Sequence, residues 1–138
     1  MSKKKHTILL IEDDLFIWEL YEHVFLKAGF AVLVAADGIA GLELAYKKPD
    51  LILLDIMMPR LNGIEVLKKL KRDKKTKAIP IVLLTNLGQE SIIKEALRIG
   101  AHDYIMKMRF TPYEIVNRVK DYFAHPNRKL DYQTLGLD

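Results

Sequence analysis

The chain has 138 residues, of which half are hydrophobic and 29% are charged, and its formal net charge is +4. This length predicts one domain with a substantial core. No apolar stretch approaches the roughly 20 residues of a membrane span, and no signal peptide is evident before the first strand, so we expect a cytoplasmic protein without membrane insertion. The lack of cysteine excludes disulfides, thiolate metal sites and cysteine nucleophiles.

Short apolar runs alternate with segments of helical period along the whole chain. This alternation predicts an α/β fold, in which a parallel sheet is covered by helices on both faces. We expect a doubly wound sheet of order 2-1-3-4-5, with its switch point between the first and third strands. The predicted strands are 7–11, 31–34, 51–54, 79–84 and 103–106; the predicted helices are 15–28, 38–46, 63–70, 91–99 and 112–123. Residues 1–124 are expected to form the domain and 125–138 a short tail.

Carboxylates follow two strands that are neighbours in this order. Glu12 and Asp13 come after the first strand, and Asp55 comes after the third. Ligands of open α/β folds bind at the carboxyl ends of the strands, so we expect these acids to converge there. Clustered carboxylates repel one another unless a cation lies among them, and ligand sets made of oxygen suit Mg²⁺. A simpler role is open for Asp14 and Glu12, which could cap the following helix.

A hydroxyl and an amine end the last two strands. Thr85 could donate to a phosphoryl oxygen, and Lys107 could place a positive charge beside the same phosphate. Each residue alone has an ordinary explanation, because threonine favours strands and a lysine at a strand end is usually solvated. The combination on four successive strand ends favours a phosphate site.

These residues together resemble the receiver domain of bacterial and archaeal two-component response regulators. The resemblance covers about Thr7 to Ala124. It is carried by Ile11-Glu12-Asp13-Asp14, by Leu53-Leu54-Asp55-Ile56-Met57-Met58-Pro59 followed by Asn62-Gly63, by Leu84-Thr85, and by Ala101-His102-Asp103-Tyr104-Ile105-Met106-Lys107.

The resemblance implies a flavodoxin-like (βα)5 receiver fold and a phosphorelay function. Asp55 would accept a phosphoryl group from a phosphohistidine on a sensor histidine kinase or a phosphotransfer protein. The family catalyses only its own phosphorylation and dephosphorylation, so we expect no separate enzyme activity. The resemblance further implies these roles: Mg²⁺ (or Mn²⁺) held by Glu12, Asp13, Asp55 and the backbone carbonyl of Met57; phosphoryl oxygens held by Thr85 and Lys107; and Tyr104 rotating as Thr85 moves inward.

The first predicted helix suggests a docking surface. Trp18 and Leu26 are left pointing outward once a core face has been assigned, and in the family the phosphodonor packs on this helix. Aromatic anchors often dominate interfaces, but single exposed apolar residues are also common. The assigned core face consists of Ile17, Leu20, Tyr21 and Val24.

Lys68 to Lys77 form a basic segment with seven cations and one acid. It could bind nucleic acid or an acidic partner, or it could be the solvated end of a helix whose dipole favours cations. We favour the second, because no aromatic residues are interleaved and no DNA-binding motif follows. The sequence beyond Phe123 is too short for a DNA-binding domain, so a stand-alone regulator without direct DNA binding is expected. Its output would be a protein target that the sequence does not identify, and a phosphorylation-dependent homodimer stays open.

Three other functions share some of these ingredients. A Mg²⁺-dependent phosphohydrolase would need a substrate cap, and no insert is long enough to form one. A flavodoxin-like cofactor binder would need a phosphate loop, whereas Glu12, Asp13 and Asp14 would repel a phosphate. A degenerate receiver that is not phosphorylated is the nearest rival, but the key positions are all present.

Overall fold

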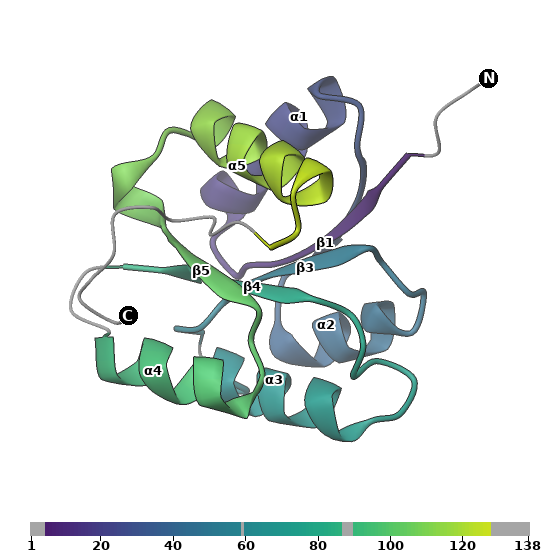
Figure 1. Ribbon diagram of the computed structural model, residues 1–138, viewed down its shortest axis with the longest axis vertical. Coiled ribbons are helices and arrows are strands. Elements are labelled where there is room, and N and C mark those ends of the chain that lie inside the picture. Colours follow the sequence, from purple (N-terminus) through teal and green to yellow (C-terminus); the bar gives the residue numbers. More distant parts are fainter. Residues whose placement is uncertain (1–4, 59, 87–89, 128–138) are drawn as a thin grey trace.

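The computed structural model describes residues 5–58, 60–86 and 90–127. It contains one five-stranded parallel sheet of order β2-β1-β3-β4-β5, as predicted (Figure 1). The elements are β1 (Thr7–Ile11), α1 (Leu15–Lys27), β2 (Ala31–Ala35), α2 (Gly38–Ala45), β3 (Leu51–Asp55), α3 (Gly63–Arg72), β4 (Ile81–Thr85), α4 (Glu90–Ile99), β5 (Asp103–Met106), the short 3-10 helix η1 (Lys107–Arg109) and α5 (Pro112–Ala124).

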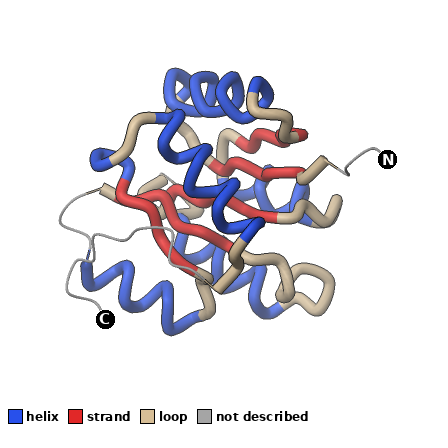
Figure 2. The backbone as a smooth tube through the Cα atoms, turned by 45° about the horizontal axis from the view of Figure 1, so that its top comes forward, coloured by secondary structure: helices blue, strands red, loops and turns tan. Residues whose placement is uncertain are grey.

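The sheet is buried on both faces, because helices cover each side of it. In Figures 1 and 2, α1 and α5 lie over one face and α2, α3 and α4 lie over the other. Side chains alternate between the faces along each strand. Leu53 therefore packs under α1 and α5, whereas Leu54 packs under the other three helices. This double burial explains why the central strands are almost entirely apolar.

Side chains that cap helix N-termini set where four of the helices begin. Asp14, Asp37 and Asn62 each accept hydrogen bonds from the first turn of α1, α2 and α3. Thr111 and Glu114 form a reciprocal capping box at the start of α5. The capping role considered for Asp14 is therefore present, since its Oδ1 accepts from the backbone amides of Phe16 and Ile17.

The fourth strand begins two residues later than predicted, at Ile81. Ile79 is buried but belongs to a turn, in which its amide donates to the carbonyl of Thr76. Pro80 has no N–H to donate, although its carbonyl accepts from Ile52. The apolar run was extended into this turn because burial alone does not distinguish a strand from a buried turn residue. The other element boundaries agree with prediction to within two residues. Most of the predicted tail, residues 128–138, lies outside the described residues.

Among the described residues, no helix is long and apolar enough to cross a membrane.

Gly63 lets α3 begin directly against the carboxyl end of β3. Its amide donates to the carbonyl of Ile56 at 3.0 Å. A Cβ at this position would lie 2.4 Å from the Ile56 Cα and 2.6 Å from the Asp55 carbonyl oxygen. Both contacts are with backbone atoms, so a larger residue would push the start of α3 away from the strand end.

Gly63→Ala is expected to lower the free energy of unfolding by about 1–3 kcal/mol, the usual cost of overpacking a rigid site. Urea denaturation would measure this loss. A change below about 0.5 kcal/mol, which is typical of a neutral surface substitution, would contradict the close approach.

Candidate functional site

Three carboxylates converge at the carboxyl edge of the sheet, as predicted. One oxygen from each of Glu12, Asp13 and Asp55 lies within 4.8 Å of the others. Glu12 and Asp55 are 1% and 5% exposed, and Asp13 lies exposed at the rim. Three oxygen donors with one open side are a donor set that suits a hard divalent cation such as Mg²⁺.

The alternation of side chains along the strands explains why these groups meet. Glu12 continues the face of Leu10 on β1, and Asp55 continues the face of Leu53 on β3. Lys107 likewise continues the face of Ile105 after β5. All three therefore emerge on the α1–α5 side of the sheet, at the edge where the parallel strands end.

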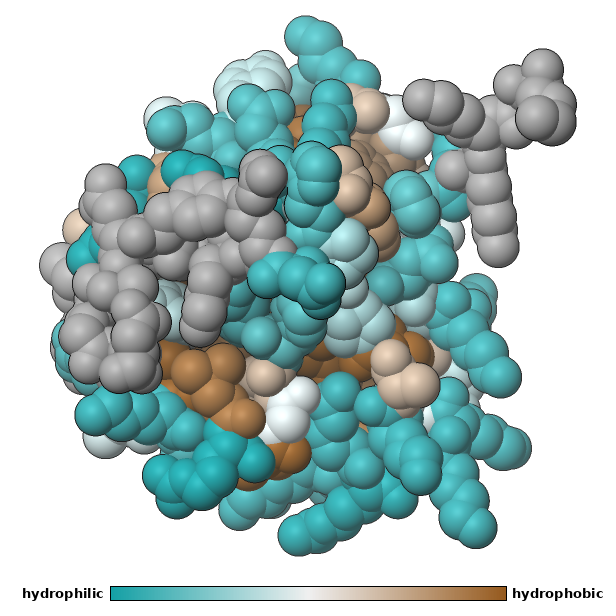
Figure 3. Space-filling model, in the orientation of Figure 1, coloured by the Kyte–Doolittle hydropathy of each residue, from teal (hydrophilic) through white to brown (hydrophobic). Residues whose placement is uncertain are grey.

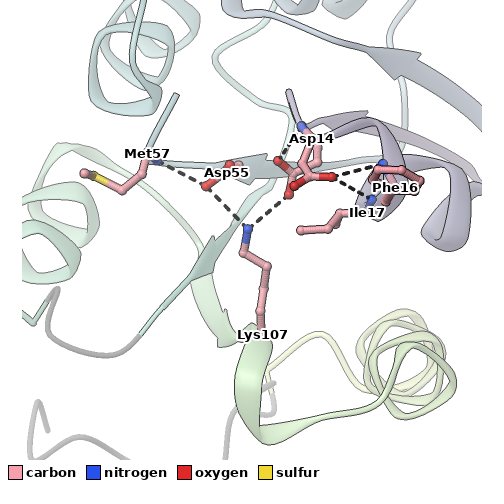
Figure 4. Close-up of polar contacts among 7 residues, drawn as sticks. Asp14, Phe16, Ile17, Asp55, Met57 and Lys107 are labelled. Carbon is pink, nitrogen blue, oxygen red and sulfur yellow. Dashed lines mark hydrogen bonds and ion pairs between the residues drawn. The ribbon is translucent and has the colours of Figure 1, made fainter. Parts of the chain in front are cut away.

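Lys107, the first residue of η1 after the edge strand β5, points its amine at the carboxylates (Figure 4). Its Nζ lies 3.0 Å from Glu12 Oε1 and 3.6 Å from Asp55 Oδ1. The Lys107 side chain is only 11% exposed, so this ion pair is poorly screened by water. The amine thus offsets part of the negative charge of the site and already lies beside Asp55. The sequence predicted its position beside the acids but not its direct pairing with Glu12.

The environment of the site disfavours the negative charge that it contains. Burial raises the pKa of the Glu12 carboxyl and Asp55 raises it further, whereas Lys107 lowers it. Partial burial, with Glu12 nearby, also raises the pKa of Asp13. Tyr21 is buried on α1, and burial together with the charges of Glu12 and Asp55 raises its pKa to about 12. A further cation at this edge is therefore favoured.

The loop after β3 holds the Asp55 carboxylate in place. The Met57 amide donates to Asp55 Oδ1 at 3.1 Å, although the Met57 side chain is 55% exposed. This bond brings the Met57 backbone next to the carboxylate, which is where the resemblance expects its carbonyl to serve the metal. An amide and an ammonium group therefore both contact the same oxygen of Asp55, Oδ1.

Thr85 ends β4 with a buried hydroxyl that has no hydrogen-bond partner in the described part of the chain. Buried polar groups are seldom left unpaired, because each costs about 1–3 kcal/mol. Thr85 Oγ1 is therefore able to donate a hydrogen bond to an acceptor that binds at the strand end.

Tyr104 is buried on the strand next to Thr85. In the register of β4 and β5, Leu83 is opposite Tyr104 and Thr85 is opposite Met106. Thr85 and Tyr104 consequently occupy diagonal positions on the same face of the sheet. Tyr104 is 3% exposed and packs in the cluster beneath α3 and α4. A movement of Thr85 would therefore change the packing of the Tyr104 ring.

The first helix differs from prediction in which apolar side chains point outward. Trp18 is half-buried against the cluster under α1 and α5, whereas Leu20 is 48% exposed. The predicted core face differs because it omits Phe25, which is buried. Trp18 precedes Tyr21 by three residues and Phe25 by seven, so all three share one helix face. Leu26 is 52% exposed, as predicted.

Phe16 was missed from the sequence and is the most exposed large apolar residue described, at 82%. It lies in the first turn of α1, where its amide donates to Asp14 at 3.0 Å. Its signal in the sequence was spacing: nine residues, or two and a half turns, separate Phe16 from the buried Phe25, so their side chains point to opposite sides of the helix.

Comparisons with known proteins identify the family to which this arrangement belongs. The family model described as the response regulator receiver domain matches residues 8–120. The chain belongs to the response regulator receiver domain family. A putative response regulator from Chloroflexus aurantiacus has a similar structure, with a TM-score of 0.78, 36% identity and coverage of 88% of this chain and 100% of that one. The chemotaxis protein CheY4 of Vibrio cholerae gives a TM-score of 0.78 at 28% identity, covering 86% and 98% of the two chains.

Curated relatives of this chain include transcriptional regulators. The chain is 43% identical over 115 residues to the phosphate regulon transcriptional regulatory protein PhoB of Pseudomonas aeruginosa, covering 83% of this chain and 50% of PhoB. It is 39% identical over 122 residues to the DNA-binding dual master transcriptional regulator RpaA of Synechocystis, covering 88% and 50%. The receiver thus spans about half the length of these relatives.

The relatives overturn the expectation that direct DNA binding plays no part. That expectation rested on where the sequence stops, and the relatives that share this receiver are transcriptional regulators, one of them DNA-binding by name. The position at which a sequence ends does not show what output a receiver controls, so it could not support the expectation that DNA binding is absent.

Thr85→Val is expected to raise the free energy of unfolding of the unphosphorylated protein by about 1 kcal/mol, because it removes an unpaired buried hydroxyl without changing the side-chain shape. Urea denaturation would measure the gain. Thr76→Val is the matched control: Thr76 is equally buried, but its hydroxyl donates to the Leu70 carbonyl at 2.7 Å. That substitution should be destabilising. Loss of stability in both variants would show that Thr85 already has a partner.

Proposed function

We propose that this receiver accepts a phosphoryl group on Asp55 from a phosphohistidine donor, and that phosphorylation switches the output of a transcriptional regulator. The observation that carries the proposal is a pair of donors at the carboxyl ends of β4 and β5, one without a partner among the described residues and one that bridges two carboxylates. Thr85 Oγ1 is buried without a partner, and the Lys107 ammonium lies 3.6 Å from Asp55 Oδ1. Both groups can donate hydrogen bonds to the oxygens of a phosphoryl group. The carboxylates alone do not provide those oxygens.

In the proposed reaction, a carboxylate oxygen of Asp55 attacks the phosphorus atom of the donor. A P–O bond forms as the P–N bond to the donor imidazole breaks, and the imidazole leaves with the electron pair. The nucleophile needs no general base, because a carboxylate carries no proton to remove. Phosphoryl transfer then depends on positioning and on neutralising charge.

Each residue of the site has a part in that neutralisation. Lys107 already touches Glu12 and Asp55, so a small movement of its Nζ would bring it onto a phosphoryl oxygen. The Met57 amide holds Asp55 Oδ1 and leaves the second oxygen of the carboxylate to attack. Mg²⁺ bound by Glu12, Asp13, Asp55 and the Met57 carbonyl would supply further positive charge.

The conformational response would begin at Thr85. A phosphoryl group adds about two negative charges, so it offers the buried hydroxyl the acceptor that it lacks. Movement of Thr85 toward this acceptor would change the space beside its diagonal neighbour, Tyr104. Tyr104 would then repack among the residues beneath α4, and this repacking would carry the signal to an output surface.

The relatives support a proposal for the output. Their names describe transcriptional regulators, and the receiver makes up about half of each. We therefore assign this receiver the task of controlling a DNA-binding regulator rather than that of a stand-alone module.

The deciding experiment is the intact mass of the protein after incubation with acetyl phosphate, in Mg²⁺ and in chelator. A single phosphoryl adduct is expected in Mg²⁺ only, and Asp55→Asn should abolish it. Asp14→Asn is the matched control, because Asp14 is also acidic and near the site but caps α1, a role that asparagine fills equally well. An adduct that persists in Asp55→Asn, or the absence of any adduct on the wild type, would refute the proposal.

Phosphodonor docking is proposed on the exposed face of α1, with Phe16 replacing Trp18 as its aromatic anchor and with Leu26 retained. Phe16→Ala is expected to slow transfer from a cognate kinase by about tenfold, as removal of an interface anchor does. Transfer from acetyl phosphate should be unchanged. Ile39→Ala is the control, because Ile39 is 59% exposed on α2, across the sheet. Equal slowing by both variants would rule out this surface.

A further inference from the structure

A strongly basic surface lies away from the phosphorylation site. It is formed by the loop after α2, by the last turns of α3 and by the turn that follows α3. Its side chains are exposed or half-buried. We call it the basic face, and its residues are Lys47, Lys48, Lys68, Lys69, Arg72, Lys74, Lys75 and Lys77.

The parallel topology places the basic face at the opposite end of the sheet from Asp55. The loop after α2 leads into β3 at Leu51, and the turn after α3 leads into β4 at Ile81, so both lie at the amino-terminal edge. A strand of five residues separates this edge from Asp55 by about 16 Å. In Figure 1 both loops lie at the right-hand side, and in Figure 3 the lower right of the same view is covered mostly by hydrophilic side chains.

Stabilisation of the α3 dipole explains only part of this charge. Lys69, Lys71 and Arg72 occupy the last turn of α3, where cations are favoured. Lys74 and Lys75 lie beyond the helix, outside the range of that effect, and other cations come from a different loop. The solvated helix end favoured from the sequence therefore does not account for the whole basic face.

The turn that carries Lys74, Lys75 and Lys77 is held firmly. The buried Thr76 hydroxyl donates to the carbonyl of Leu70 at 2.7 Å. The Lys71 ammonium donates to the carbonyls of Lys77 and Ile79 at 3.0 and 3.1 Å, which ties the end of α3 to the far side of the turn. These contacts fix the backbone, so the cations project from a preformed surface.

Within the described residues, no cation of the basic face forms an ion pair. The ion pairs found there involve His6 and Lys107. Asp73, the one acid of the segment, instead accepts from the Lys75 amide at 2.8 Å and from the Tyr46 hydroxyl. With seven cations and one acid, the segment from Lys68 to Lys77 has a larger positive net charge than the whole chain, whose net charge is +4. The remaining residues together are therefore net negative.

The chemistry of the face favours a phosphate backbone over a protein or a membrane. Tyr46 is the one large apolar residue that the described structure exposes beside it, and its hydroxyl is bound to Asp73. Protein interfaces are depleted in lysine and built around apolar anchors, and membrane-surface helices add apolar side chains that insert. Lysines alone suit phosphates, which they neutralise without reading bases.

We propose that the basic face binds the phosphate backbone of duplex DNA and helps to hold the receiver on it, independently of the state of Asp55. The choice of DNA over other polyanions rests on the proposed function, in which the receiver belongs to a transcriptional regulator.

Fluorescence anisotropy with a labelled duplex of arbitrary sequence would test this proposal at several salt concentrations. Replacing Lys74, Lys75 and Lys77 together by glutamine should weaken binding about tenfold at low salt. It should also reduce the slope of log affinity against log salt by about 0.9 for each phosphate that the protein no longer neutralises. The matched control replaces Lys27, Lys94 and Lys120, which are exposed on α1, α4 and α5, and changes the net charge equally. The control should bind nearly as well as wild type.

Three results would overturn the proposal: absence of duplex binding by the wild type, equal weakening in the two triple variants, or tighter binding to anionic phospholipid vesicles than to DNA. The phosphoryl adduct formed with acetyl phosphate is measured on the same proteins. This second measurement distinguishes failure of the DNA-binding proposal from failure of the proposed function. A basic-face variant that is phosphorylated normally but binds DNA weakly supports the inference. A wild type that binds DNA in this way but is not phosphorylated would refute the proposed function alone.

Discussion

The site depends on one electrostatic constraint: three carboxylates share a sheet edge where little water reaches two of them. Glu12 and Asp55 are almost wholly buried, and burial raises the pKa of Glu12. Charges of one sign cannot be held together there without a counter-charge. Lys107 supplies part of that counter-charge at 3.0 Å from Glu12. The site therefore favours binding of a further cation. It also allows Lys107 to exchange its contact with Glu12 for another anionic partner.

The backbone around the site is closely fitted as well. Gly63 lets α3 start against the end of β3, and the Met57 amide holds the Asp55 carboxylate. Such contacts keep the reactive oxygen in place, which a transfer governed by positioning requires. Among the residues that the structure describes, the Thr85 hydroxyl is the one buried side-chain polar group without a hydrogen-bond partner. We interpret this hydroxyl as the group through which a phosphoryl group on Asp55 would stabilise a second conformation, by accepting its hydrogen bond.

The sequence was most informative where a pattern had few physical solutions. Apolar runs alternating with helical segments favoured a doubly wound parallel sheet, and in the order chosen for it the carboxylates after β1 and β3 meet at the carboxyl edge. It was less informative on the surface of α1, where leaving Phe25 out of the core rotated the assigned face and turned Trp18 outward. The ion pair between Lys107 and Glu12 was also missed, because the two residues are brought together only by tertiary structure. The pairing state of the Thr85 hydroxyl likewise depends on neighbours that no local pattern specifies.

In the mechanism proposed for this receiver, Thr85 and Lys107 are the donors reserved for a phosphoryl group on Asp55. A crystal structure of the protein with Mg²⁺ and beryllofluoride, which mimics that group on the carboxylate, would show directly whether they are. We expect Thr85 Oγ1 and Lys107 Nζ both to lie about 3 Å from fluorine atoms, and Lys107 to have left Glu12. A structure in which the beryllofluoride is bound but Thr85 remains unpaired and Lys107 still contacts Glu12 would contradict this mechanism.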